Sequence, residues 1–218
     1  MREFKARFLE LIAAKADVNV KDAQNRTPLH YAASSGNFLA TEMLIDAKAD
    51  VNVRDSCGKA PVDLTLGTYV YECLILLVAA KAQVGGAHLW WATEDDDYGA
   101  MKALIDAKVP VNIPDGNRRL PLHEAAENGS SSAVQILLWG NAAVNVKDAS
   151  RRTPLHLAAG SCDRTGLTVA VLVDANAALN VQDDRGRTPL HMASECGDSG
   201  AVQFLVDAKA TLDVTDEC

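Results

Sequence analysis

Short apolar stretches and polar turns alternate along the chain with a fixed period. The phrase Ala-Lys-Ala-Asp-Val-Asn-Val begins at Ala14 and again at Ala47. Weaker copies open at Ala80, Ala107, Gly140, Ala175 and Ala208. The successive steps are 33, 33, 27, 33, 35 and 33 residues. A period of this length indicates a stack of repeated structural units, with a deletion in one unit and an insertion in another.

A second phrase, Thr-Pro-Leu-His, recurs in phase with the first. It stands at Thr27, Thr153 and Thr188, with degenerate copies at Ala60 and Leu120. Threonine at a helix N-cap offers its hydroxyl to free backbone N–H groups, and proline at the first helical position has no N–H to leave unpaired. The phrase therefore predicts a short first helix in each unit, such as one from Pro28 to about Ser35.

A second helix and a projecting loop complete the predicted unit. From about Phe38 to Ala47, Met43, Leu44 and Ala47 stand at helical spacing and supply one buried stripe. Lys48 then takes a position that usually adopts left-handed backbone geometry. Residues 55–59 are turn-rich, so the connection to the next unit is predicted to be a hairpin. Each unit is thus helix, turn, helix, hairpin.

These phrases resemble the ankyrin repeat. Its pattern of Gly-x-Thr-Pro-Leu-His-x-Ala-Ala, followed by Leu-Leu and Ala-Asp-Val-Asn, is similar to residues 186–193 and 44–52. The resemblance implies an all-α fold, an ankyrin-repeat solenoid of stacked helix-turn-helix units with projecting β-hairpin fingers. The sequence departs from the family where a helix-ending glycine is expected, and lysine enters left-handed geometry there at a cost of about 1 kcal/mol. These positions are Lys15, Lys48, Lys81, Lys108 and Lys209, with Asn141 and Asn176.

We expect a single ankyrin-repeat domain over residues 1–218, opening with a lone N-terminal helix and turn over 1–21. The predicted repeats are 22–54, 55–84, 85–114, 115–147, 148–182 and 183–214. The deletion falls in the third repeat, which is predicted to have a shortened finger that leaves a gap. Trp90 and Trp91 follow it about 100° apart on a helix. One is expected to fill the gap and the other to face outward.

Composition and charge argue against some classes of function. A formal net charge of -8 argues against a general nucleic-acid binder, which needs a basic surface. No apolar run reaches the roughly 20 residues that span a bilayer, so we expect no direct membrane insertion. The cysteines have no paired spacing and favour reduced thiols over a disulfide framework. They are Cys57, Cys73, Cys162, Cys196 and Cys218. The expected location is intracellular and cytoplasmic, with an organelle as the alternative.

Catalytic, cofactor and metal motifs are not found in the sequence, so we expect no enzyme, no cofactor and no metal site. Four histidines share one repeat slot, which the resemblance assigns to hydrogen bonds with the threonine and backbone of the motif. They are His30, His123, His156 and His191. His88 lies in the shortened repeat and lacks nearby metal-ligand partners. The run from Glu94 to Asp97 is interpreted as a solvated or partner-facing acidic turn, with a Ca²⁺ site as the alternative.

A basic residue precedes the helix-starting phrase in five units. These residues are Arg26, Lys59, Arg119, Arg152 and Arg187, and Arg118, Arg151 and Arg185 lie beside them. Because one residue per repeat projects in one row, they predict a line of positive charge suited to an acidic partner. The alternative is that each pairs with the aspartate that opens a turn, such as Asp22, Asp55 or Asp148.

The family resemblance implies a non-catalytic protein–protein interaction module or scaffold that binds a partner protein along its concave finger and first-helix face. The alternative is an ankyrin segment of a larger enzyme or channel. The partner-binding residues are expected to be Arg26, Lys59, Trp90, Trp91, Glu94, Asp95, Arg119, Arg152, Arg185 and Arg187. The last repeat lacks a polar capping sequence, so we also expect another chain, or further sequence, to cover it.

Overall fold

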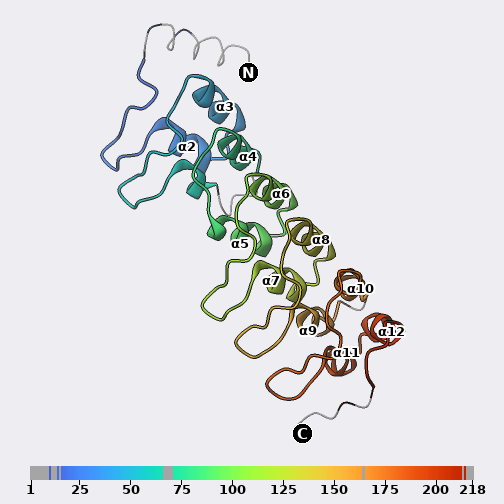
Figure 1. The fold of residues 1–218 in the computed structure, drawn as a ribbon. Helices are drawn as coiled ribbons and strands as arrows, with labels where there is room; N and C mark the ends of the chain where they lie inside the picture. The colour runs from blue at the N-terminus through green and yellow to red at the C-terminus, as the bar shows by residue number, and fades with distance from the viewer. Residues whose placement is uncertain are drawn as a thin grey trace. The chain divides into compact units, whose positions relative to one another are not determined.

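The structure, a computed structural model, describes residues 10, 14, 16–65, 71–163, 165–212 and 214. Within these residues it is built of helices, with no strand (Figure 1). The all-α repeat fold predicted from the sequence is therefore confirmed. The lone helix predicted over 1–21 lies largely outside the described residues, as does Lys15.

Each repeat contributes a first helix and a second helix. The pairs are α2 (Pro28–Ser34) with α3 (Phe38–Asp46), η1 (Pro61–Leu64) with α4 (Tyr71–Ala79), α5 (Gly86–Glu94) with α6 (Tyr98–Asp106), α7 (Pro121–Glu127) with α8 (Ser131–Trp139), α9 (Pro154–Ala159) with α10 (Leu167–Asp174), and α11 (Pro189–Cys196) with α12 (Ser199–Asp207). In the second repeat the first helix is reduced to the 3-10 turn η1.

The chain divides into two compact units, residues 1–88 and residues 89–218. The division falls within α5, in the repeat that carries the deletion. In this repeat the chain runs directly from the end of α4 into α5 at Gly86, and no finger forms between them. The Gly85 N–H caps α5 by donating to His88 Nδ1 at 3.2 Å.

The first helices begin as the helix-starting phrase predicts. Thr27 is extended at φ -94°, and Pro28 opens α2. The Thr27 N–H donates to His30 Nδ1 at 3.0 Å, and the Thr27 hydroxyl lies 2.9 Å from the same nitrogen. Thr153 with His156, and Thr188 with His191, repeat this arrangement. The structural role predicted for the histidine slot is confirmed.

The second helices end in left-handed geometry, as predicted. The residue after each has a φ between 62° and 68° at Lys48, Lys81, Lys108, Asn141, Asn176 and Lys209. A row of asparagines then accepts a hydrogen bond from a backbone N–H one repeat later. The pairs are Asn19 and Asp50, Asn52 and Gln83, Asn112 and Ala143, Asn145 and Ala178, and Asn180 and Thr211, at 2.8 or 2.9 Å. This row joins neighbouring repeats within each unit.

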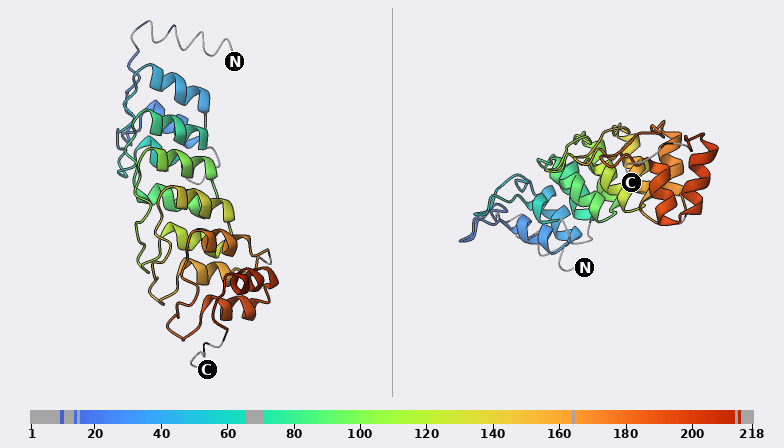
Figure 2. Two further views of the ribbon diagram at one scale, coloured as in Figure 1. Left: turned by 45° about the vertical axis from the view of Figure 1, so that its right-hand side comes forward. Right: turned by 90° about the horizontal axis from the view of Figure 1, so that it is seen from below.

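The core consists of leucines between the two helix layers. Leucines with 0% exposure recur in most of the helices, at Leu29, Leu77, Leu89, Leu104, Leu122, Leu137, Leu155, Leu172 and Leu205. Burial of each of these leucine side chains stabilises the fold by roughly 1.5–3 kcal/mol relative to an exposed side chain. In residues 89–218 the finger loops extend from the side of α7, α9 and α11, away from α8, α10 and α12 (Figures 1 and 2).

A disulfide joins the last two repeats. The two-residue insertion lengthens the turn between α9 and α10, and Cys162 in this turn bonds Cys196 at the end of α11, with 5.4 Å between their Cα atoms. The prediction of reduced thiols is wrong for this pair. Their separation of 34 residues is about one repeat, so the two cysteines stand at nearly equivalent positions of neighbouring repeats. Because disulfides persist in oxidising compartments, the cysteines no longer favour an intracellular location. Cys57 and Cys73 are free, and Cys218 lies outside the described residues.

Candidate partner-binding surface

Each finger is a turn organised by its opening aspartate. In the finger of residues 148–152, Asp148 Oδ1 accepts hydrogen bonds from the N–H groups of Ser150 at 2.9 Å and Arg152 at 2.8 Å. One backbone bond, from the Asp148 N–H to the Arg152 carbonyl at 2.9 Å, closes the loop. The fingers opened by Asp22, Asp55, Asp115 and Asp183 share this pattern. The predicted hairpins are thus tight turns, held mainly by one carboxylate.

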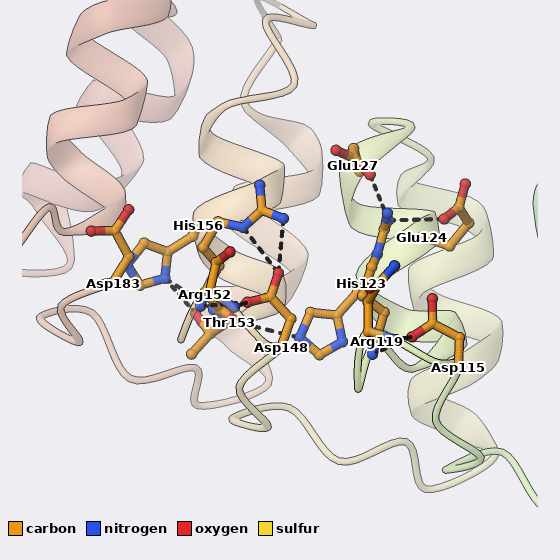
Figure 3. A network of polar contacts seen from close by, with 12 residues as sticks. Asp115, Arg119, His123, Glu124, Glu127, Asp148, Arg152, Thr153, His156 and Asp183 are labelled. Atoms are coloured by element: carbon orange, nitrogen blue, oxygen red, sulfur yellow. Dashed lines mark hydrogen bonds and ion pairs between the residues drawn. The ribbon is translucent and has the colours of Figure 1, made fainter. Parts of the chain in front are cut away.

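The basic residue that closes a finger is usually neutralised by the chain itself. Arg152 pairs with Asp148 at 2.9 Å, and Arg187 pairs with Asp183 at 3.0 Å (Figure 3 shows the first pair). In residues 1–88, Arg26 instead reaches Asp55 of the following finger at 3.2 Å. The alternative in which these arginines pair with turn-opening aspartates therefore holds for three of them.

Arg119 differs from the other finger arginines. Its guanidinium binds Glu124 at 2.8 Å and also contacts Glu127, both on α7 (Figure 3). Burial raises the pKa of Glu124 above its ordinary value of 4.5, while the Arg119 charge opposes this shift. Arg119 is thus held on α7 with 19% of its side chain exposed, and its charge is already balanced by two carboxylates.

The pairing at Asp183 sets the charge state of the last finger. Burial alone would raise the pKa of Asp183, but the backbone N–H groups of Arg187 and Arg185 and the Arg187 guanidinium lower it below 3.8 overall. Asp183 is therefore ionised at neutral pH and holds Arg187 in place. Arg187 also reaches the exposed carboxylate of Glu195 on α11 at 3.2 Å.

Histidines on α2, α7 and α9 link the first helix to the next finger. His123 Nε2 lies 3.3 Å from the Arg152 carbonyl, and His156 Nε2 lies 3.1 Å from the Arg187 carbonyl. Since a carbonyl only accepts, Nε2 carries the proton and Nδ1 is free to accept from the motif N–H. Burial lowers the pKa of both imidazoles below 6.5. The link therefore uses neutral histidine, and it fixes the finger arginines relative to the preceding helix.

Other basic residues predicted at the surface have exposed and unpaired side chains. Lys59 and Arg185 are exposed, and neither side chain forms an ion pair with a residue that the structure describes. The same holds for Arg118 and Arg151, which the sequence placed beside the main row and left out of the binding set. The sequence could have identified these two residues, because both stand at the finger-tip position, where the backbone has positive φ.

The two tryptophans after the missing finger have different environments, as predicted. The half-buried Trp90 donates its indole N–H to the Ile113 carbonyl at 3.0 Å. Trp91 on α5 keeps 49% of its surface exposed. Glu94, the last residue of α5, and Asp95, which follows it, are also exposed. These three residues form an exposed aromatic and acidic site at the end of a first helix.

The acidic run after Trp91 serves the fold at one residue. Asp97 caps α6 by accepting from the Ala100 N–H at 3.0 Å. Among the described residues, no three His, Cys, Asp or Glu side chains are grouped to hold a metal ion. No helix in the described part of the chain is long and apolar enough to cross a membrane.

Comparison with known proteins agrees with this architecture. The chain matches the family "Ankyrin repeats (3 copies)" over residues 62–148 and 122–216, and "Ankyrin repeats (many copies)" over residues 11–64. Among solved structures, it is similar to the human ASB11 ankyrin repeat domain, with 22% identity, a TM-score of 0.70 and 94% of each chain covered. This likeness shows the fold. No curated protein matches the chain.

Proposed function

Since the chain belongs to the ankyrin-repeat family, we propose that it is a non-catalytic interaction module that binds a partner protein along its finger and first-helix face. Residues 1–88 contribute Arg26 and Lys59. Residues 89–218 contribute Trp90, Trp91, Glu94, Asp95, Arg119, Arg152, Arg185 and Arg187. Within each unit, carboxylates and histidines of the chain itself hold the fingers in place, and a surface held in this way loses less entropy on binding.

Trp91 is the observation that carries this proposal. Binding energy at protein interfaces concentrates in a few residues, and tryptophan and arginine are the commonest among them. Trp91 keeps 49% of its surface exposed on the first helix α5. Trp90, the residue before it, is half-buried and has its indole N–H bonded to the Ile113 carbonyl.

The test uses the full chain as bait in the native source, identification of the captured partner by mass spectrometry, and calorimetry with the purified partner. Trp91→Ala is expected to weaken binding at least tenfold. The matched control is Trp139→Ala, because Trp139 ends the second helix α8 and is 62% exposed. A partner that is insensitive to Trp91→Ala but lost with Trp139→Ala would place the binding face on the second helices.

A partner chain is also proposed to cover the last repeat. Leu190 on α11 is half-buried, whereas its counterparts Leu122 and Leu155 have 0% exposure. His191 Nε2 has no acceptor among the described residues, although His156 Nε2 donates to the next finger. The α11 face thus resembles an interior face without its neighbour. If the isolated chain is monomeric and α11 exchanges amide hydrogens as slowly as α9, this covering partner is not needed.

A further inference from the structure

The finger tips of residues 89–218 carry positive charge that the chain does not neutralise. Arg118, Arg151 and Arg185 are exposed, and their guanidinium groups have no hydrogen bond or ion pair with any described residue. The neighbouring finger-closing arginines are all paired with carboxylates. The unpaired charge therefore lies at the tips and not at the finger bases.

These tips form one continuous row. The Ala149 N–H donates to the Asn117 carbonyl at 2.9 Å, which ties the finger of Arg118 to the finger of Arg151. The Asp184 N–H donates to the Ser150 carbonyl at 3.1 Å, which ties the next finger in the same way. Three arginines thus occupy three consecutive, hydrogen-bonded fingers, one per finger.

Two of the arginines stand where the backbone disfavours them. Arg118 has a φ of 61° and Arg151 a φ of 62°, in the left-handed region. The same tip position holds Asn25, Gly58 and Gly186 in the other fingers, which suit that geometry. An ordinary side chain costs roughly 1–2 kcal/mol there. Lysines at the helix ends carry the same backbone cost, so the cost alone assigns no function. What distinguishes Arg118 and Arg151 is that both are exposed and unpaired on adjacent, hydrogen-bonded fingers.

We propose that this tip row docks an extended acidic segment of a partner protein, with Arg118, Arg151 and Arg185 each pairing with one carboxylate. This proposal rests on the proposed function and specifies the chemistry of the partner. The charges are spread one per finger and do not converge on a point, so they fit a line of single carboxylates better than one phosphate group. Asp115 and Asp184 are also exposed, in the first and the last of these fingers, so the attraction is expected to be strongest at the middle finger, around Arg151. The net charge of -8 disfavours a nucleic acid.

The probe is a fluorescein-labelled deca-glutamate peptide, and its binding to the full chain is measured by fluorescence anisotropy at low and high salt. Binding to the wild type is expected to weaken as salt rises. The variant Arg118→Asn, Arg151→Asn, Arg185→Asn is expected to bind at least tenfold more weakly. Asparagine suits left-handed geometry, so this variant is expected to melt no lower than the wild type, which separates loss of binding from loss of folding.

The matched control is Lys102→Asn, Lys108→Asn, Lys209→Asn, which removes three exposed positive charges from the second helices and their ends. Two of these positions also have positive φ, at 64° for Lys108 and 68° for Lys209. The control is expected to retain peptide affinity within about twofold. Equal losses of peptide affinity in both variants would show that net charge alone drives binding, and would overturn the proposal that the peptide docks on the tip row.

Two further outcomes overturn the proposal without touching the proposed function. One is no binding of deca-glutamate to the wild type at low salt. The other is at least tenfold tighter binding of a phosphoserine peptide or a single-stranded oligonucleotide of equal charge. In either case, the loss of a captured partner with Trp91→Ala would still support an interaction module. The opposite result is also distinguishable. If the wild type binds deca-glutamate but the captured partner is insensitive to Trp91→Ala, the tip row stands and the proposed role of Trp91 fails.

Discussion

The fingers of residues 1–88 and those of residues 89–218 use the same motif but present different surfaces. In the first unit, Arg26 pairs with Asp55 of the next finger, and the tips are Asn25 and Gly58. In the second unit the closing arginines pair within their own repeat. Arginines stand at two tips, Arg118 and Arg151, and next to the third, where Arg185 precedes Gly186. One turn-opening aspartate builds every finger, so the fold leaves the tip residue free to vary. The tip therefore determines what a finger offers to a partner.

The first helices of the two units also differ, both in length and in the residue that fills the histidine slot. Residues 1–88 contain one full first helix and the short turn η1, where Asp63 takes the histidine slot and accepts from the Ala60 N–H at 2.7 Å. Residues 89–218 contain α7, α9 and α11 with histidine in that slot. Both units contain the histidine link between repeats, at His30 with the Lys59 carbonyl in the first unit and at His123 and His156 in the second.

The largest expected effect is on the core of the second unit. Leu155→Ala removes a side chain with 0% exposure from α9 and is expected to lower the free energy of unfolding by about 2–5 kcal/mol. Chemical denaturation measures this, and amide hydrogen exchange locates the loss in residues 89–218. Leu167→Ala is the control, because Leu167 is 54% exposed. Equal losses in the two variants would contradict the assigned packing.

The disulfide is expected to have the next largest effect, and it is specific to the second unit. Reduction of the Cys162–Cys196 bond is expected to cost about 2–4 kcal/mol, because the bond closes a loop of 34 residues in the unfolded chain. Dithiothreitol should lower the melting temperature of the wild type and leave Cys162→Ser, Cys196→Ser unchanged. A wild type that melts at the same temperature with and without reductant would rule out the bond as a stabilising element.

A smaller effect distinguishes two histidines in the same slot. His156→Ala loses bonds to Thr153 and the bond to the Arg187 carbonyl, whereas His191→Ala loses only those within its own repeat. His156→Ala is therefore expected to cost about 1 kcal/mol more, the net worth of one hydrogen bond. Urea denaturation compares the two variants. If His191→Ala lowers the free energy of unfolding more than His156→Ala does, the hydrogen bond between repeats contributes less to stability than expected.

The smallest effect is the pH dependence of the second unit. The folded pKa values of His123 and His156 lie below the unfolded value of 6.5, so the unfolded chain binds more protons below that pH. Their contribution is complete above pH 6.5 and is lost as the pH falls through the folded pKa values. Urea denaturation from neutral to mildly acidic pH should show this decline. The double variant His123→Gln, His156→Gln should show a shallower decline, and an equal slope would assign the effect to other groups.

The sequence predicted the repeat architecture, because the helix-starting phrase, the buried leucines and the helix-ending residues each act within one repeat. It also predicted the missing finger and the different environments of Trp90 and Trp91. It did not decide which arginines remain free, because Arg119 could reach Glu124 or Asp115, and only the three-dimensional arrangement selects the first. The disulfide was missed because its cysteines are neighbours in space, across one repeat, and not in sequence.

The claim that residues 89–218 bind a partner through fingers and first helices is tested most directly by hydrogen exchange of the chain with and without the captured partner. The account predicts new protection in the fingers at 115–119, 148–152 and 183–187 and at the end of α5, with little change in α6, α8, α10 and α12. Protection confined to those second helices, with the fingers unchanged, would contradict it.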